Sequence, residues 1–203
     1  MLLQILTYTH HLTTMLFGIF LSAFFLGVKQ NKKNVCILLG GGAVSGLFFL
    51  ICNTVFGSLF TEAVYPIFVH LPLFLLLVFY YRFRWLPSII SIMTAYLCCQ
   101  FSNWAGIFAL SLSGLDWIYY LVRIIVTVAV FAFLSRYLCQ TTALLFAKSD
   151  RELYILGAMP FVYYVFDYST TKFSMLLYSG NKVVVEFLAF AMCISYVIFL
   201  FVY

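Results

Sequence analysis

The sequence predicts an all-α fold, a polytopic membrane helix bundle with about seven transmembrane helices. Of its 203 residues, 66% are hydrophobic and 8% are charged, and the mean hydropathy is +1.11. A soluble domain carries roughly 25% charged residues. Apolar stretches of about 20 residues, long enough to cross a hydrocarbon core of roughly 30 Å, recur along the chain. These stretches are continuous rather than alternating, which favours helices over a membrane β-barrel.

The candidate spans are separated by short polar joints. They cover residues 5–28, 35–57, 65–81, 87–110, 117–135, 153–170 and 183–203. In the second span, Gly42 and Gly46 form a G-x-x-x-G pattern that permits close approach of another helix. In the third span, Pro66 and Pro72 remove backbone donors, which predicts a bend or an irregular turn near His70.

Helix starts are marked in two later spans. Pro87 fits the first turn of the fourth span, and Ser149 with Glu152 predicts a capping box at the sixth. Pro160 predicts a further irregularity inside the sixth span. No loop is longer than residues 136–152, so we expect residues 1–203 to form a single transmembrane domain with no soluble domain.

The basic residues predict the orientation. Eight of them fall in one set of alternate loops, against Lys172 and Lys182 in the other set. The eight are Lys29, Lys32, Lys33, Arg82, Arg84, Arg136, Lys148 and Arg151. By the positive-inside rule, the N-terminus lies outside and the C-terminus in the cytoplasm, in a multi-pass cell-membrane protein. The last span ends at Tyr203 with no basic residue after it, so we expect the chain to continue inside the cell.

Composition also argues against several kinds of site. Six cysteines lie in or beside apolar spans without a C-x-x-C pattern, so we expect no disulfide framework, no metal site and no cofactor. The net charge of +5 comes mostly from the basic loops. It therefore indicates topology and contact with lipid rather than nucleic acid. The chief partner is the lipid bilayer.

Polar side chains within the spans gather toward the outer side, and Arg123 is the most unusual of them. An arginine in the centre of a span costs roughly 2.5–3.5 kcal/mol on insertion scales, so it needs a partner. Asp167 and Glu186 are the candidate partners. The predicted outward ligand pocket comprises Arg123, Asp167, Gln100, Asn103, His70, Tyr120, Tyr163, Tyr164, Asn53 and Glu186.

Spacing supports this grouping, although a second interpretation stays open. Polar residues recur at helical intervals, as Tyr96, Gln100 and Asn103 in one span and Tyr120, Arg123 and Thr127 in the next. The alternative is a dry ion-pair network that only fixes the order of the helices. Glu186 in particular could form an interfacial pair with Lys182.

Two stretches resemble the membrane sensor region of Firmicutes sensor histidine kinases with a GHKL-type ATPase domain. They are "THHLTTMLFGIFLSAFFLGVKQNKKN" and "VHLPLFLLLVFYYRFRWLPSIISIMTAYLCCQFSNWAGIFAL". The resemblance implies a bacterial cytoplasmic-membrane protein, a homodimer comparable to the accessory-gene-regulator receptor, that senses an extracellular peptide or small molecule. No catalytic motif of that family is present, so this chain alone is not expected to be an enzyme. We expect a sensor whose last helix passes the signal to a cytoplasmic kinase domain absent from this chain.

Two other function classes were weighed. Three helices, a linker helix and three more helices is also the plan of small transporters, but polar groups are scarce in the inner half of the spans. A membrane peptidase is disfavoured because Cys139 falls on the inner side and the histidines on the outer side. The chain also has no H-E-x-x-H sequence.

Overall fold

The fold is all-helical, as predicted. A computed structural model describes residues 1–57, 60–61, 64–172 and 182–202, and the side chains within 1–57, 60–61, 64–167 and 190–201. The described part contains no strand. Its helices are α1 (Leu2–Phe25), α2 (Lys32–Phe56), η1 (Pro66–His70), α4 (Leu71–Leu75), η2 (Leu76–Tyr80), α5 (Trp85–Cys98), α6 (Gln100–Ser113), α7 (Asp116–Tyr137), α8 (Cys139–Phe146), α9 (Asp150–Lys172) and α11 (Lys182–Val202).

Each predicted apolar segment coincides with one helix or a short series of helices. Within the described residues, three helical stretches are long and apolar enough to cross a membrane: Lys32–Phe56, Trp85–Ser113 and Asp116–Tyr137. The chain is therefore consistent with a membrane protein, while the count of seven spans and their orientation stay predictions. Helix α8 was not predicted, because its apolar run is too short to be distinguished from a loop.

The third segment has the irregularity that its prolines predict. Its first part, η1, is π-helical, and the Leu71 amide bonds back to the carbonyl of Pro66, five residues earlier. Pro72 has no amide to donate, so the regular i→i−4 ladder cannot continue through this turn. His70 lies in this widened turn. In contrast, α9 continues through Pro160 without ending there.

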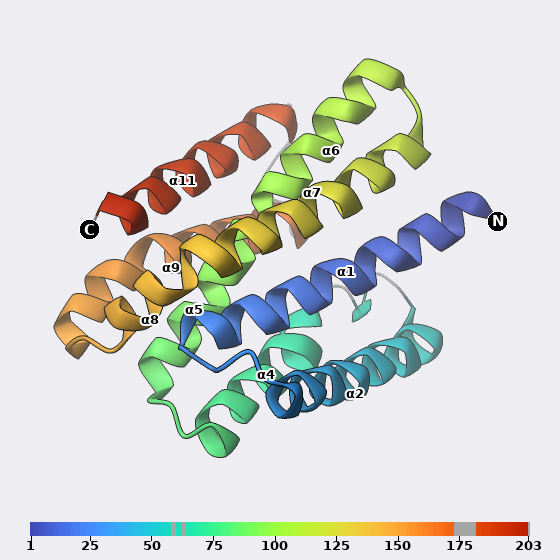
Figure 1. The fold of residues 1–203 in the computed structure, drawn as a ribbon. Helices are drawn as coiled ribbons and strands as arrows, with labels where there is room; N and C mark the ends of the chain where they lie inside the picture. Colours follow the sequence, from blue (N-terminus) through green and yellow to red (C-terminus); the bar gives the residue numbers. More distant parts are fainter. Residues whose placement is uncertain (58–59, 62–63, 173–181, 203) are drawn as a thin grey trace.

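Helix α1 lies near the middle of the bundle, between α2 and α4 on one side and α7 on the other (Figure 1). It also packs against α5 and α8, while α6 packs along α7 and α9 packs along α5. The two chain ends lie at opposite ends of the molecule (Figure 1). Fully buried apolar side chains from four of these helices, such as Leu21, Leu97, Leu134 and Leu156, share one core.

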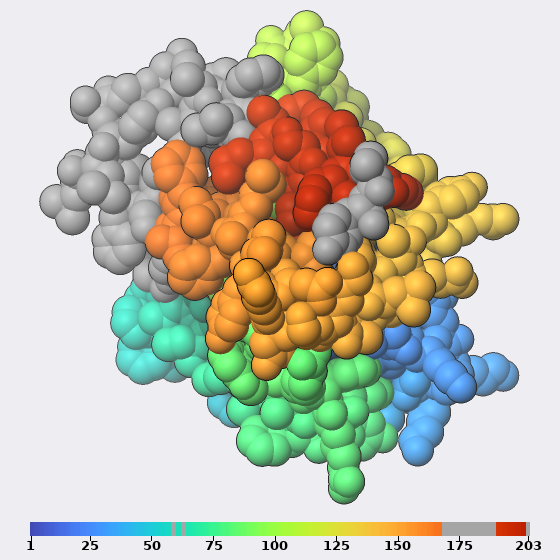
Figure 2. Space-filling view, turned by 90° about the vertical axis from the view of Figure 1, so that its left-hand side faces the viewer, coloured from blue at the N-terminus to red at the C-terminus, as the bar shows by residue number. Residues whose placement is uncertain are grey.

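Polar links between helices lie outside the predicted pocket as well. The Ser91 hydroxyl of α5 donates to the Ser22 carbonyl of α1 at 2.5 Å. At the end of the bundle that carries the predicted cytoplasmic loops, Arg84 donates to Asp150 at 2.6 Å and to the Lys148 carbonyl at 2.6 Å. These contacts hold the starts of α5 and α9 together. In Figure 2, which faces this end, α9 lies between α11 and α5.

Gly42 and Gly46 of α2 face the protein's own helix α1. A methyl group added at Gly42 would lie 3.0 Å from Ile19 Cδ1, and one added at Gly46 would lie 3.5 Å from Met15 Cε. Packing within the chain therefore accounts for the G-x-x-x-G pattern.

Candidate functional site

Six of the ten predicted pocket residues lie in two clusters rather than one. The first cluster joins η1, α5 and α9. His70 Nδ1 is hydrogen-bonded to the Tyr164 hydroxyl at 2.8 Å, and the Tyr96 hydroxyl donates to Asp167 Oδ2 at 2.5 Å. Asp167 is 8% exposed and Tyr163 is fully buried. We call His70, Tyr96, Tyr163, Tyr164 and Asp167 the histidine–tyrosine network.

Aromatic contacts pack this network tightly. The Tyr164 ring centroid lies 5.0 Å from that of Tyr96 and 5.5 Å from that of His70. The Tyr65 ring meets His70 edge-on at 5.4 Å. Edge-on and tilted ring pairs at these separations are the favoured arrangements of aromatic side chains. The network therefore combines polar bonding with close apolar contact between three segments.

The composition of the network defines the chemistry available to it. Its polar atoms are one imidazole, phenol hydroxyls and one carboxylate. The imidazole bonds to the Tyr164 hydroxyl, and the carboxylate accepts from the Tyr96 hydroxyl. Among the described residues, no group of three or more His, Cys, Asp or Glu side chains is placed to hold a metal ion. Hydrogen-bonded groups of this kind fix the relative positions of helices and can exchange partners when a polar ligand enters.

The second cluster joins α1, α6 and α7 around Arg123. Arg123 Nη1 donates to the Tyr119 hydroxyl at 2.5 Å, and its guanidinium carbon lies 5.1 Å from the centroid of that ring. The Tyr120 ring lies 5.8 Å from His10 of α1. We call His10, Gly106, Tyr119, Tyr120 and Arg123 the arginine cluster.

Arg123 and Asp167 do not form the ion pair that the sequence led us to expect. Asp167 accepts from Tyr96 and Arg123 donates to Tyr119. The ion pairs recorded among the described side chains are Arg84–Asp150 and Lys148–Glu152. An arginine side chain on a helix extends toward the helix N-terminus. Arg123 therefore reaches Tyr119, one turn earlier.

The remaining predicted pocket residues are dispersed. Asn103 Nδ2 donates to Gln100 Oε1 at 3.3 Å on α6, and Gln100 is buried. Asn53 is half-buried on α2, one turn after Phe49, whose ring contacts Tyr65. Glu186 lies in α11, but its side chain is outside the described residues.

Sequence reasoning missed three tyrosines that belong to the two clusters or pack against them. Tyr96 was recognised as part of a polar stripe but not placed in the pocket, and Tyr65 and Tyr119 were not singled out. The spacing of Tyr119 to Arg123, four residues, is a usable signal for a phenol that receives an arginine. Tyr65 gives no such signal, since it precedes the irregular turn that brings it to His70.

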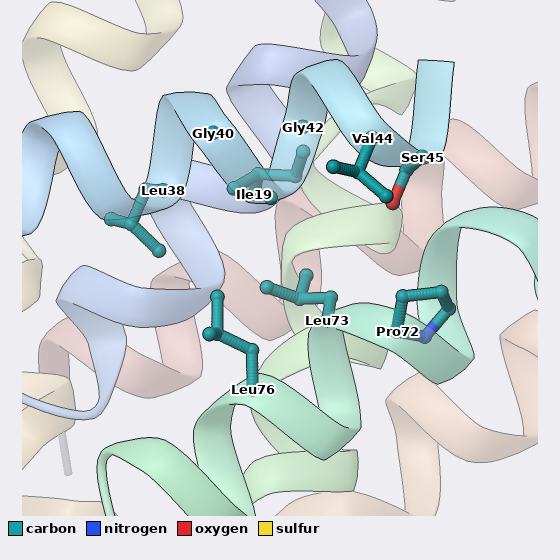
Figure 3. Close-up of a pocket in the computed structure, with 10 residues that line it drawn as sticks. Ile19, Leu38, Gly40, Gly42, Val44, Ser45, Pro72, Leu73 and Leu76 are labelled. Carbon is teal, nitrogen blue, oxygen red and sulfur yellow. The ribbon is translucent and has the colours of Figure 1, made fainter. Parts of the chain in front are cut away.

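A cavity of about 220 Å³ lies away from both clusters, between α2 and the third segment (Figure 3). Its walls are apolar except for Ser45, and they include Leu38, Leu73 and Leu76. The glycines of α2 form its upper edge in Figure 3. No residue of the histidine–tyrosine network or of the arginine cluster lines this cavity.

Comparison of the chain with known protein families, with curated proteins and with solved structures finds no match.

Proposed function

We propose that this chain is an integral membrane sensor module. An extracellular peptide or small molecule would enter an outward-facing polar site at the histidine–tyrosine network. Its polar groups would exchange with the hydrogen bonds now made between helices. The last helix, α11, would carry the resulting shift to a cytoplasmic output domain, in a homodimer of the kind that the sequence resemblance implies.

One observation carries this proposal: the network and α11 are bonded to the same two helices. Helix α5 supplies Tyr96 to the network, and its Leu97 carbonyl accepts from the Cys193 thiol of α11 at 3.1 Å. Helix α9 supplies Tyr164 and Asp167, and its Leu156 carbonyl accepts from the Tyr196 hydroxyl of α11 at 3.0 Å. A shift of α9 against α5 therefore changes both supports of α11.

The physical requirement for such a signal is differential binding. A ligand shifts a conformational equilibrium only by the difference between its affinities for the two states. A ligand that replaces the Tyr96–Asp167 or His70–Tyr164 bond favours a state in which η1, α5 and α9 separate. Rigid-body shifts of packed helices by 1–2 Å are a known form of this response.

Side-specific thiol labelling tests the site. Single cysteines would be placed at positions 70, 100, 103 and 164 in a background without the native cysteines. A membrane-impermeant maleimide would then be applied to the full chain in vesicles from each side. Gln4→Cys and Lys29→Cys serve as controls for the predicted outside and cytoplasmic sides. We expect the cysteines at positions 70, 100, 103 and 164 to react from outside only.

Each other result points to a different account. Labelling of these positions from both sides would favour a carrier, because a transporter exposes its central site alternately. No labelling from either side would contradict an open polar site, and the network would then be a structural element only. Reaction of Lys29→Cys from outside would reverse the orientation.

A further inference from the structure

Arg123 occupies a position built for its side chain but left incompletely bonded. Its stem crosses α6 at Gly106, where an added methyl group would lie 2.4 Å from Arg123 Cγ. Its Nη1 donates to Tyr119, whereas Nε is buried and has no hydrogen-bond partner. A buried donor without an acceptor costs free energy, and such groups commonly mark a site for water or an ion.

Thr127, one turn further along α7, has the same property. Its hydroxyl is buried without a partner, and the residue is 2% exposed. Five other helical threonines donate to the carbonyl four residues earlier, namely Thr7, Thr9, Thr13, Thr61 and Thr142, whereas Thr94 of α5 is likewise buried without a partner. Thr127 does not make that bond, so unsatisfied donors lie on two successive turns of α7.

Among the described residues, the surroundings of Arg123 supply hydrogen-bond donors but no carboxylate. The Tyr119 hydroxyl accepts from Arg123, which leaves its own proton available for donation. The His10 ring of α1 is tilted against that of Tyr120, with the two centroids 5.8 Å apart. Among the described side chains, none carries a carboxylate within ion-pair distance of Arg123. The nearest acidic residue along the helix is Asp116, two turns earlier.

We propose that Arg123 and Tyr119 form a binding site for an oxyanion, a phosphate or a carboxylate group, between α6 and α7. A planar guanidinium presents Nε and an Nη nitrogen side by side, the geometry that binds two oxygens of such a group. The anion would accept from Nε and from the tyrosine hydroxyl. This inference does not rest on the proposed sensing role, since an anion bound at Arg123 can hold α6 and α7 together without being the sensed ligand.

Two sources provide this chemistry. Arg123 lies seven residues into α7, or about 10 Å at a rise of about 1.5 Å per residue. At that depth an arginine reaches either a lipid headgroup phosphate at the outer surface or a small soluble anion. Both sources bring oxygen acceptors to the same donors.

Thermal unfolding of the full chain in alkyl maltoside micelles, which contain no phosphate, tests the site. Inorganic phosphate and phosphatidylglycerol are added separately, with chloride at equal ionic strength and a neutral glycolipid as their controls. At saturation we expect at least one phosphate probe to raise the unfolding midpoint by about 3–5 °C. A rise with the lipid alone identifies a headgroup site, and a rise with inorganic phosphate identifies a site for soluble anions.

Two variants decide whether the rise belongs to Arg123. Arg123→Gln should abolish the rise, whereas Arg136→Gln should retain it. Arg136 is the matched control, because it lies on the same helix and also over a tyrosine ring. If Arg123→Gln does not fold, Tyr119→Phe should raise the half-saturating concentration about 5-fold. No rise with either probe, equal loss in both arginine variants, or unchanged half-saturation in Tyr119→Phe would overturn the proposal.

Discussion

The two hydrogen bonds of the histidine–tyrosine network differ in strength because only one has an ionisable carboxylate as its acceptor. Tyr96 donates to Asp167, while His70 and Tyr164 share a bond between two side chains that are neutral when the histidine is unprotonated. Bonds between helices in membranes average about 0.6 kcal/mol. Bonds to charged groups contribute about 1.5–3 kcal/mol. Asp167 should therefore hold α9 against α5 more firmly than His70 holds η1.

Replacing the two tyrosines one at a time tests this difference. We expect Tyr96→Phe to lower the free energy of unfolding by about 1.5–2 kcal/mol, since it deprives a buried acceptor of its donor. Tyr164→Phe should lower it by about 0.6 kcal/mol. Unfolding by a denaturing detergent measures both values, and Tyr154→Phe, at an exposed position, is the control. Equal losses in the two network variants would contradict the assignment of the stronger bond to Asp167.

The helices that carry the polar residues could be predicted from the sequence, but the side-chain partners could not. Arg123, Asp167, His70 and Tyr164 are correctly recognised as polar groups inside apolar helices. Their division into two clusters depends on the rotation of each helix about its axis, which tertiary packing sets. Gly106 shows the difficulty, because only the missing side chain of a glycine on α6 leaves room for the stem of Arg123 beside Tyr119.

At the scale of the helices, local signals predicted the starts of α5 and α9 and the irregular turn near His70, whereas α9 runs through Pro160 as one helix. The Glu152 carboxylate accepts from the Ser149 amide at 3.2 Å and from its hydroxyl at 2.8 Å, so half of the predicted capping box is present. In a full capping box the Ser149 hydroxyl would accept from the backbone amide of Glu152. Here it donates to the Glu152 carboxylate instead. The division of residues 87–110 into α5 and α6 could not be predicted, because nothing in the apolar run around Cys99 marks an end.

Glu152 gives the start of α9 a dependence on pH. Hydrogen bonds from Ser149 and the nearby charge of Lys148 lower the pKa of Glu152, which lies before the predicted span. A lowered folded-state pKa means that the ionised form favours folding. This contribution is present above the ordinary pKa of 4.5 and is lost as the pH falls through the lowered value.

The expected result is a difference between wild type and Glu152→Gln in the midpoint of thermal unfolding. The wild type should be the more stable at pH 7, and the difference should shrink below pH 4.5 and disappear once the pH lies below the lowered pKa of Glu152. Measuring both proteins over this range in the same detergent cancels the titration of other groups. A difference that stayed constant with pH would show that it does not come from the ionisation of Glu152.

Close packing between α5 and α9 depends on one glycine. A methyl group added at Gly157 would lie 2.6 Å from Ile90 Cγ1 and 2.7 Å from its Cδ1. We expect Gly157→Ala to lower the free energy of unfolding by about 1–3 kcal/mol. Ile90→Ala makes room, so the double variant should lose less than the sum of the single losses, by about 1 kcal/mol or more.

The control for this cycle is Gly18→Ala, because no atom lies within 4 Å of the added methyl group. It should change stability by no more than about 0.5 kcal/mol or stabilise α1 slightly. Unfolding titrations of the four proteins of the cycle give the coupling. Additive losses would mean that the two helices adjust their separation without a specific contact between these residues.

At the scale of the whole molecule, α5 and α9 connect the histidine–tyrosine network to α11. The composition predicted a membrane helix bundle, yet it could not predict that these two helices, 66 residues apart at Arg84 and Asp150, pack together. Helix α9 contacts both α5 and α11. This arrangement gives a change at Asp167 a direct route to the last helix.

Cys193 reports on that route, because its thiol is fully buried and donates to the Leu97 carbonyl at 3.1 Å. With the other five cysteines replaced by alanine, we expect Asp167→Asn to speed the reaction of Cys193 with a membrane-permeant maleimide about 5- to 10-fold. Replacing the carboxylate by a neutral amide weakens the Tyr96 bond, so α9 is held less firmly against α5 and the contacts of α11 on both helices open more often. Asp150→Asn, which breaks an exposed ion pair at the far end of α9, should leave the rate unchanged. Equal rates in wild type and Asp167→Asn would mean that the network and α11 move independently, and the last helix could not then carry its signal.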